Sequence, residues 1–157
     1  MNSLGYDYAA GIFSAAEPPC VSLYQPTHRR HPENQQDPIR FRNLLKALEQ
    51  SLRQKYATRD VRPLMEPFQT LAEDRGFWNH TLDGLAVLAA QGVFRVYRLQ
   101  RPVAELAVVA DSFHIKPLIR IVQSADRYQV LGLNRQEVKL FEGNRDALDE
   151  IELHPVI

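Results

Sequence analysis

The sequence predicts an α/β protein of the α+β type, in which a mixed β-sheet carries a packed helical hairpin and a C-terminal β-hairpin follows. Three observations predict this class. Residues 37–72 place apolar side chains at helical spacing, residues 84–99 show two strand patterns joined by a short turn, and residues 128–141 contain a second pair of alternating strands. At 157 residues, the chain is long enough to bury a real core.

The N-terminal segment contains a first weak helix and a first strand. Residues 1–17 carry a short apolar patch that is broken by Gly11 and stopped by a Pro-Pro pair, so we expect one helix that docks on the rest of the protein. Residues 20–24 favour β structure. The polar run 25–37 has no apolar residue that could anchor it, and we expect a surface loop there.

Two helices follow this loop. Asp37 before Pro38 has the pattern of an N-cap followed by a first-turn proline, and apolar residues recur at helical spacing from there to Tyr56. A second helix is expected over about 60–72, with Pro67 kinking it. The two helices should form a hairpin whose outer face carries most of the local positive charge.

The second half of the chain is predicted to be mostly β structure. A hairpin is expected from strands at 84–90 and 93–99, and a well-buried strand at 105–110. A short helix should begin at Pro117 and run to about residue 122.

The end of the chain shows a second hairpin pattern. Strands are expected at 128–133 and 138–141, joined by a turn at 134–136 and followed by the acidic stretch 142–152. Because no further element remains to cover this hairpin, we expect it to be the start of a second domain that the end of the chain truncates.

Charge is balanced over the whole chain but uneven along it. The 19 basic and 19 acidic residues cancel, so no global field drives the protein onto nucleic acid or an anionic membrane. Residues 28–62, however, hold nine Lys or Arg against four acidic residues. No apolar run approaches the roughly 18 residues that a membrane span needs. The single cysteine, Cys20, lies in an apolar run and should be buried, so we expect a cytoplasmic protein.

The loop at 28–31 and the start of the next helix form the candidate nucleic-acid-binding site. Its residues are His28, Arg29, Arg30, His31, Arg40, Arg42 and Lys46. Guanidiniums beside imidazoles suit contacts with phosphates or an RNA backbone, and the basic helix face extends the patch if the loop folds back over the helix start. Two other interpretations stay open: a loop that is only solvated, and a metal site at His28 and His31, for which no third or fourth ligand is evident nearby.

Common catalytic motifs are absent from the sequence. It contains no dinucleotide-binding glycine fingerprint, P-loop, HExxH, GxSxG or paired CxxC pattern. Asp111, Ser112 and His114 are residue types of hydrolase triads, but neighbours in sequence do not face one another, so His114 is expected to be structural. We therefore predict no catalytic residue, no metal and no cofactor in this chain.

Several sequence strings together carry a resemblance to a known family. They are CVSLYQPTHR (20–29), QDPIR (36–40) with NLL (43–45), FW (77–78) ahead of DGLAV (83–87), FRVYRL (94–99), FHIKPL (113–118), and YQVLGL (128–133) leading to VKLFEG (138–143). In this order they resemble the bacterial archaeo-eukaryotic release factor family, most closely its third subfamily. The match spans residues 20–143.

The resemblance implies a domain organisation. Such proteins are similar to archaeal and eukaryotic class 1 release factors and to Pelota, with an N-terminal domain, an RNase H-like middle domain and a C-terminal domain like a ribosomal protein. On this comparison residues 1–125 are the N-terminal domain, and residues 126–157 are the first β-hairpin of a truncated middle domain.

The resemblance also implies a role in translation termination or ribosome rescue, with the ribosome, rRNA or tRNA and the missing middle and C-terminal domains as partners. The Gly-Gly-Gln motif that hydrolyses peptidyl-tRNA is missing from this sequence, and so are the Asn-Ile-Lys-Ser and Tyr-x-Cys-x-x-x-Phe patterns linked to stop codons. The chain is therefore expected to be a non-catalytic, ribosome-facing domain. A protein-interaction or regulatory module is the alternative, and an enzyme of unrecognised type is a third.

Overall fold

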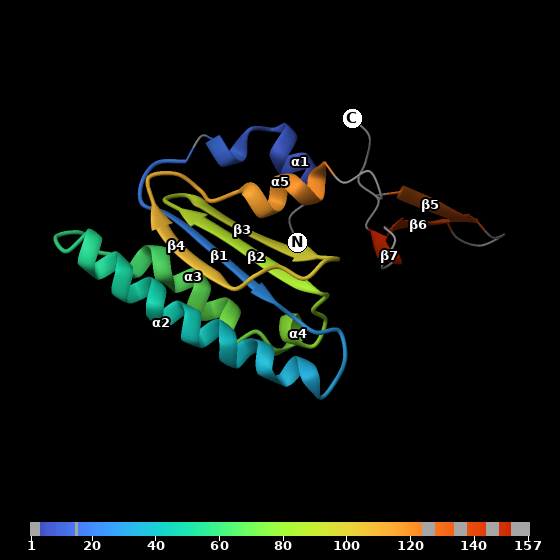
Figure 1. Cartoon of the computed structure of the whole chain (residues 1–157), viewed down its shortest axis with the longest axis horizontal. Coiled ribbons are helices and arrows are strands. Elements are labelled where there is room, and N and C mark those ends of the chain that lie inside the picture. Colours follow the sequence, from blue (N-terminus) through green and yellow to red (C-terminus); the bar gives the residue numbers. More distant parts are fainter. Residues whose placement is uncertain (1–3, 15, 124–127, 134–137, 144–147, 152–157) are drawn as a thin grey trace. The chain divides into compact units, whose positions relative to one another are not determined.

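The computed structural model describes residues 4–14, 16–123, 128–133, 138–143 and 148–151. The chain divides into two compact units, Met1–Val122 and Gln123–Ile157. The first unit holds a four-stranded sheet with helices on both of its faces, and the second unit holds a three-stranded sheet (Figure 1).

The sheet of the first unit is antiparallel. Its strands are β1 (Cys20–Pro26), β2 (Gly84–Ala90), β3 (Val93–Leu99) and β4 (Leu106–Ala110), in the order β3-β2-β1-β4. The predicted α+β class is confirmed, but the expectation of a mixed sheet was wrong, since every strand pair in this sheet is antiparallel. The reason is the helical hairpin between β1 and β2. Two antiparallel helices return the chain to the end of β1 at which it left, so Gly84 starts β2 opposite Pro26.

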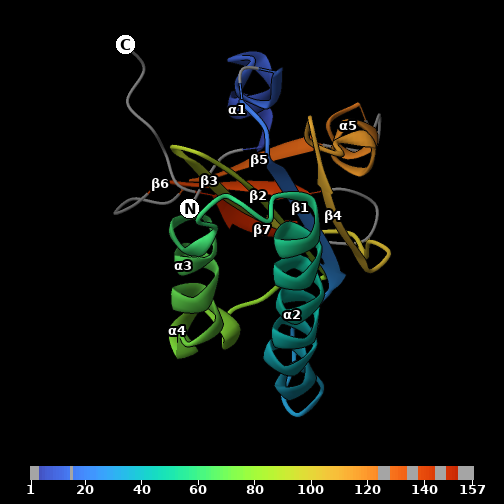
Figure 2. The same cartoon turned by 90° about the vertical axis from the view of Figure 1, so that its left-hand side faces the viewer.

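The first face of the sheet is covered by the predicted helical hairpin, which consists of α2 (Asp37–Lys55) and α3 (Arg62–Ala72) (Figures 1 and 2). Phe41 and Leu48 of α2 are fully buried and belong to one core cluster with Phe68 of α3 and Leu23 of β1. The cluster contains apolar residues from both helices and from three strands, so burial of this face holds the hairpin on the sheet. Helix α3 continues through Pro67.

The second face of the sheet is covered by three short helices, α1 (Leu4–Ala9), the 3-10 helix η1 (Ile12–Ser14) and α5 (Lys116–Val122) (Figure 1). Gly11, with φ 73°, separates α1 from η1 in the left-handed region that glycine favours. Phe13 meets Tyr97 of β3 edge-to-face with ring centroids 6.1 Å apart, and the Tyr97 hydroxyl donates a 2.6 Å hydrogen bond to the buried carboxylate of Asp7. The N-terminal segment is therefore docked on the sheet, as expected.

Strand β4 differs from the prediction of a well-buried strand. It lies at an edge of the sheet, and of its five residues only Val109 is buried. Lys55, at the end of α2, donates a 2.6 Å hydrogen bond from Nζ to the carbonyl oxygen of Val109. Continuous apolar patterning does not distinguish an edge strand from a central one, because it does not show whether the strand is paired on one side or on both.

Two further short helices were not predicted. The 3-10 helix η2 (Glu33–Gln36) precedes α2, and α4 (Arg75–Trp78) follows α3. Both therefore lie near the end of the helical hairpin at which α2 begins and α3 ends. Across the described part of the chain, no helix combines the length and apolar character needed to cross a membrane.

The second unit contains strands β5 (Tyr128–Leu133), β6 (Val138–Gly143) and β7 (Leu148–Ile151), paired antiparallel in the order β5-β6-β7. Strand β7 falls in the acidic stretch, for which no element was predicted. The turn predicted at 134–136 lies outside the described residues. That this unit opens an RNase H-like domain stays a prediction.

Candidate functional site

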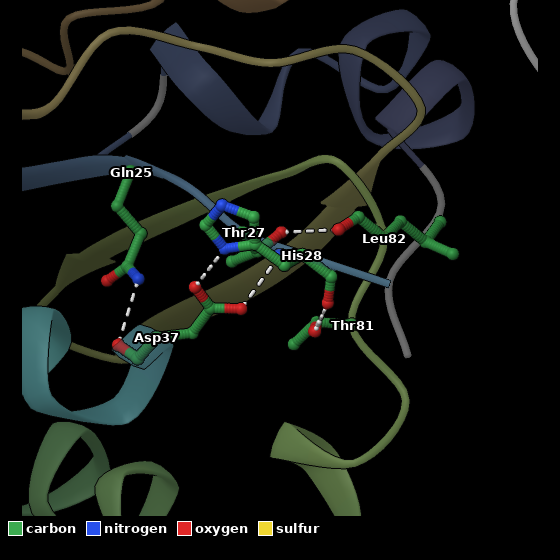
Figure 3. A network of polar contacts seen from close by, with 6 residues as sticks. All are labelled: Gln25, Thr27, His28, Asp37, Thr81 and Leu82. Carbon is green, nitrogen blue, oxygen red and sulfur yellow. Dashed lines mark hydrogen bonds and ion pairs between the residues drawn. The ribbon is translucent and has the colours of Figure 1, made fainter. Parts of the chain in front are cut away.

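The loop between β1 and α2 is tethered by the buried carboxylate of Asp37 (Figure 3). Asp37 is 1% exposed, and its two oxygens accept hydrogen bonds from the backbone N–H and from Nδ1 of His28, both at 2.8 Å. The prediction of Asp37 as the N-cap of α2 was therefore wrong. Gln36 is the N-cap residue and makes no side-chain cap bond, whereas the carboxylate of Asp37 is engaged by His28.

Polar side chains complete this tether (Figure 3). Gln25 Nε2 donates to the backbone oxygen of Asp37 at 3.1 Å, and the hydroxyl of Thr81 donates to the backbone oxygen of His28 at 2.6 Å. Thr27 donates from its hydroxyl to the Leu82 carbonyl at 2.8 Å. The loop has no apolar anchor, as the sequence indicates, but buried hydrogen bonds fix its two ends instead.

Arg29 is paired within the protein. Its guanidinium forms a fork on the carboxylate of Asp83, with Nη2 2.7 Å and Nε 3.0 and 3.1 Å from the carboxylate oxygens. Both side chains are about one-third exposed, at 31% and 30%. A phosphate would have to compete with this bidentate pair, so Arg29 is a weaker candidate for phosphate contact than its sequence context suggests.

A pocket of about 670 Å³ lies where α2 begins and α3 ends. We call it the hairpin-end pocket. Its charged or titratable lining residues are His31, Arg42, Glu73 and Arg75, its amide side chains are Asn34, Gln35 and Asn79, and its apolar lining is Pro38, Ala72 and Trp78. The pocket therefore combines cations, neutral hydrogen-bonding groups and one carboxylate over an apolar base.

Local contacts fix the walls of the hairpin-end pocket. Arg42 Nη2 donates to the carbonyl oxygen of Ala72 at 3.3 Å, which joins the start of α2 to the end of α3. Asp74 caps α4 by accepting the backbone N–H of Phe77 at 3.0 Å. The indole N–H of Trp78 donates to the Leu71 carbonyl at 2.9 Å, and its ring lies 5.1 Å from that of Phe41. Packing thus holds Trp78 beneath the pocket.

A partly buried arginine lies next to α4. The guanidinium carbon of Arg98 lies 5.0 Å from the centroid of the Phe77 ring, in cation–π geometry. Burial lowers the pKa of Arg98, and the nearby carboxylate of Asp74 opposes that shift. An arginine remains charged despite such shifts, so this cation adds to the positive potential near α4.

The structure divides the predicted basic patch. At about 100° per residue, Arg42 and Lys46 share one flank of α2, whereas Arg40 lies about 160° from Arg42 around the helix axis. Arg30 and His31 are exposed on the loop. Of the predicted residues, only His31 and Arg42 line the hairpin-end pocket.

Sequence reasoning missed most of the pocket. Arg75, Glu73 and Trp78 were not predicted as site residues, and neither were the three amide side chains. A signal was available, because an antiparallel helical hairpin must place the residues after α3 beside the start of α2. The connection from 73 to 79 could therefore have been assigned to the same end of the hairpin as the basic loop.

The other groups that the sequence offered as candidates, His114 and Cys20 among them, lie in structural contacts and not in the pocket. No group of three or more His, Cys, Asp or Glu that could hold a metal ion occurs among the residues that the structure describes. Cys20 is buried as predicted, and burial together with the charge of Asp111 raises the pKa of its thiol. The backbone of His114 accepts the Tyr24 hydroxyl and donates to Ser22 Oγ, in agreement with a structural role.

Comparison with known proteins supports the fold. No family model matches the sequence, and no curated protein matches it. A solved structure titled "Archaeal protein" is similar to this chain, with a TM-score of 0.50 and 13% sequence identity. The similarity covers 94% of this chain and 43% of that one, so this chain spans less than half of that protein's length. At this identity the likeness concerns the α+β fold alone.

The tether can be tested by Asp37→Asn. The substitution removes the charge of a buried acceptor and replaces one of its two oxygens with an NH₂ group, so we expect the free energy of unfolding to fall by about 1.5–3 kcal/mol. Urea denaturation followed by the fluorescence of Trp78 measures it. Asp83→Asn is the matched control, since it breaks a partly exposed pair worth about 0–1 kcal/mol. Equal losses for the two variants would contradict the assigned role of Asp37.

Proposed function

We propose that this chain is the non-catalytic, ribosome- or RNA-facing domain of a bacterial release-factor-like protein that acts in translation termination or ribosome rescue. The observation that carries the proposal is the hairpin-end pocket, where Arg42 of α2 and Arg75 of α4 line one surface with His31 of the loop. Because the sequence strings resemble the release factor family, we propose RNA, and not another anion, as the ligand of this basic surface.

The charge distribution supports an RNA-facing surface. Arg42 and Lys46 are exposed on one flank of α2, and Arg75 is exposed on α4. The protein carries no net charge, so a local cluster of cations, not a global field, must supply the attraction to phosphates. Guanidiniums donate several hydrogen bonds in a fixed geometry that matches phosphate oxygens.

Co-sedimentation with bacterial ribosomes across a salt series tests the proposal. The unmodified protein should bind at low salt and dissociate as salt rises, because phosphate contacts release counterions. A variant with Arg42→Glu, Lys46→Glu and Arg75→Glu should bind much more weakly, and it should reduce the slope of log affinity against log salt by about 2 to 3.

The matched control is a variant with Arg53→Glu, Arg59→Glu and Arg62→Glu. These three exposed arginines give the same change in net charge, and none of them lines the hairpin-end pocket. It should bind nearly as well as the unmodified protein. No binding at low salt, or equal binding by the two variants, would refute the proposal, and association that does not depend on salt would favour the interaction-module alternative.

A further inference from the structure

We infer that the hairpin-end pocket holds one unpaired nucleotide of an RNA strand, with its phosphate on Arg42 and Arg75 and its base and ribose on the amide groups and Glu73. This inference rests on the proposed function and names the ligand unit that the pocket takes. The size of the pocket, the placement of its cations, and the presence of groups that a simple anion site does not need support it.

The size of the pocket suits a nucleotide. Its volume of about 670 Å³ falls within the range of pockets that take drug-sized ligands, roughly 300–1,000 Å³. A phosphate ion alone would leave most of this space to water. A base with its ribose can occupy it and cover the apolar part of the lining at Pro38 and Trp78.

The cations are placed to hold the phosphate. Arg42 is oriented by the bond from Nη2 to the Ala72 carbonyl, which uses one of the five N–H donors of a guanidinium. Arg75 is exposed on the first turn of α4, whose Asp74 cap fixes the local backbone. Two guanidiniums that line one pocket from different helices can bind one phosphate from two sides.

The remaining polar groups indicate more than an anion. Glu73 repels phosphate, so it would weaken a plain anion site, but a carboxylate accepts hydrogen bonds from ribose hydroxyls and from the amino groups of bases. Asn34, Gln35 and Asn79 offer both donors and acceptors, as the edges of bases require. The bases of a single strand leave their Watson–Crick edges free for such contacts, whereas those of a duplex use these edges for pairing.

Trp78 provides the readout. It is the only tryptophan of the chain, it is 5% exposed, and it lines the pocket. A ligand that displaces water from this lining changes the surroundings of the indole ring. The fluorescence of the intact protein therefore reports on the pocket itself.

The experiment titrates the full chain with each of the four nucleoside 5′-monophosphates, with the matching nucleosides and with inorganic phosphate, and follows Trp78 fluorescence and calorimetric heat. At least one monophosphate should bind about tenfold or more tightly than its nucleoside and than phosphate. Only the monophosphate contacts both the two arginines and the groups proposed to hold the base and ribose. A short single-stranded RNA should displace it, and a duplex of the same sequence should not.

Three variants sharpen the test. Arg42→Gln and Arg75→Gln should each weaken monophosphate binding about tenfold or more, while Arg62→Gln, which removes an exposed charge away from the pocket, should leave it unchanged. Unaltered Trp78 emission without ligand shows that each variant is folded. The inference is wrong if neither fluorescence nor calorimetry detects a monophosphate, if phosphate alone binds as tightly, or if the RNA strand fails to displace the nucleotide.

The inference and the proposed function fail separately. Salt-dependent ribosome binding without nucleotide binding would leave the proposed function standing and remove the pocket as a nucleotide site. Binding of monophosphates and single-stranded RNA without any ribosome binding would keep the nucleotide site and overturn the role on the ribosome.

Discussion

Replacing Phe41 with alanine should lower the free energy of unfolding of the first unit by about 3–5 kcal/mol. Phe41 is 0% exposed, and its ring lies 5.1 Å from that of Trp78 and 6.4 Å from that of Phe68. The substitution leaves a cavity between α2, α3 and α4 that these rings cannot fill without moving. Because Trp78 lines the hairpin-end pocket, the same substitution should also loosen the pocket and shift Trp78 emission.

Urea denaturation, followed by Trp78 fluorescence and by circular dichroism, measures the effect of Phe41→Ala. Ile39→Ala is the matched control on the same helix, since Ile39 is 58% exposed and its truncation should change stability by no more than about 0.5 kcal/mol. A loss below about 1 kcal/mol for Phe41→Ala would mean that the core around Trp78 is not packed as described.

Alkaline pH should destabilise the first unit through two buried tyrosines. Burial raises the pKa of Tyr24, and burial together with the hydrogen bond to Asp7 raises the pKa of Tyr97. The folded state therefore keeps both phenols protonated while the unfolded chain loses these protons above about pH 10. Stability is fully present below that value and falls as pH rises above it, by about 1.4 kcal/mol per pH unit for each tyrosine.

Urea denaturation between pH 9 and 11 tests this dependence, with roughly the reference tyrosine pKa of 10 at its centre. Tyr97→Phe should remove about half of the tyrosine contribution to the slope, at the cost of leaving the Asp7 carboxylate without its hydroxyl donor at every pH. A stability that stays constant up to pH 11 would contradict the burial of the two phenols.

The sequence was most informative where packing follows periodicity. The apolar residues of α2 recur at the spacing that puts Phe41, Leu48 and Leu52 on one face, so both the helix and its buried side could be predicted. The turn at Gly92, which has φ 74°, likewise identified the hairpin of β2 and β3. The antiparallel order of the sheet was also implied by the two helices between β1 and β2, although a mixed sheet was predicted.

The candidate site was less predictable because its polar side chains form hydrogen bonds and ion pairs with residues that are distant in sequence. Asp37 stands where an N-cap is expected but binds His28, and Asp83 pairs with Arg29 across 54 positions. Neither choice follows from local propensity, since several donors and acceptors compete for each group. The separation of Arg40 from Arg42 could have been predicted from helix geometry alone.

The tether of the loop by Gln25, Thr27, Asp37 and Thr81 has a consequence for how this protein can vary among its relatives. The buried hydrogen bonds fix the course of the loop, so those four positions should tolerate little change. The exposed loop residues, such as Arg30 and His31, make no contribution to that tether and can be exchanged without unfolding the protein. Selection can thus alter what the loop binds while the fold beneath it stays the same.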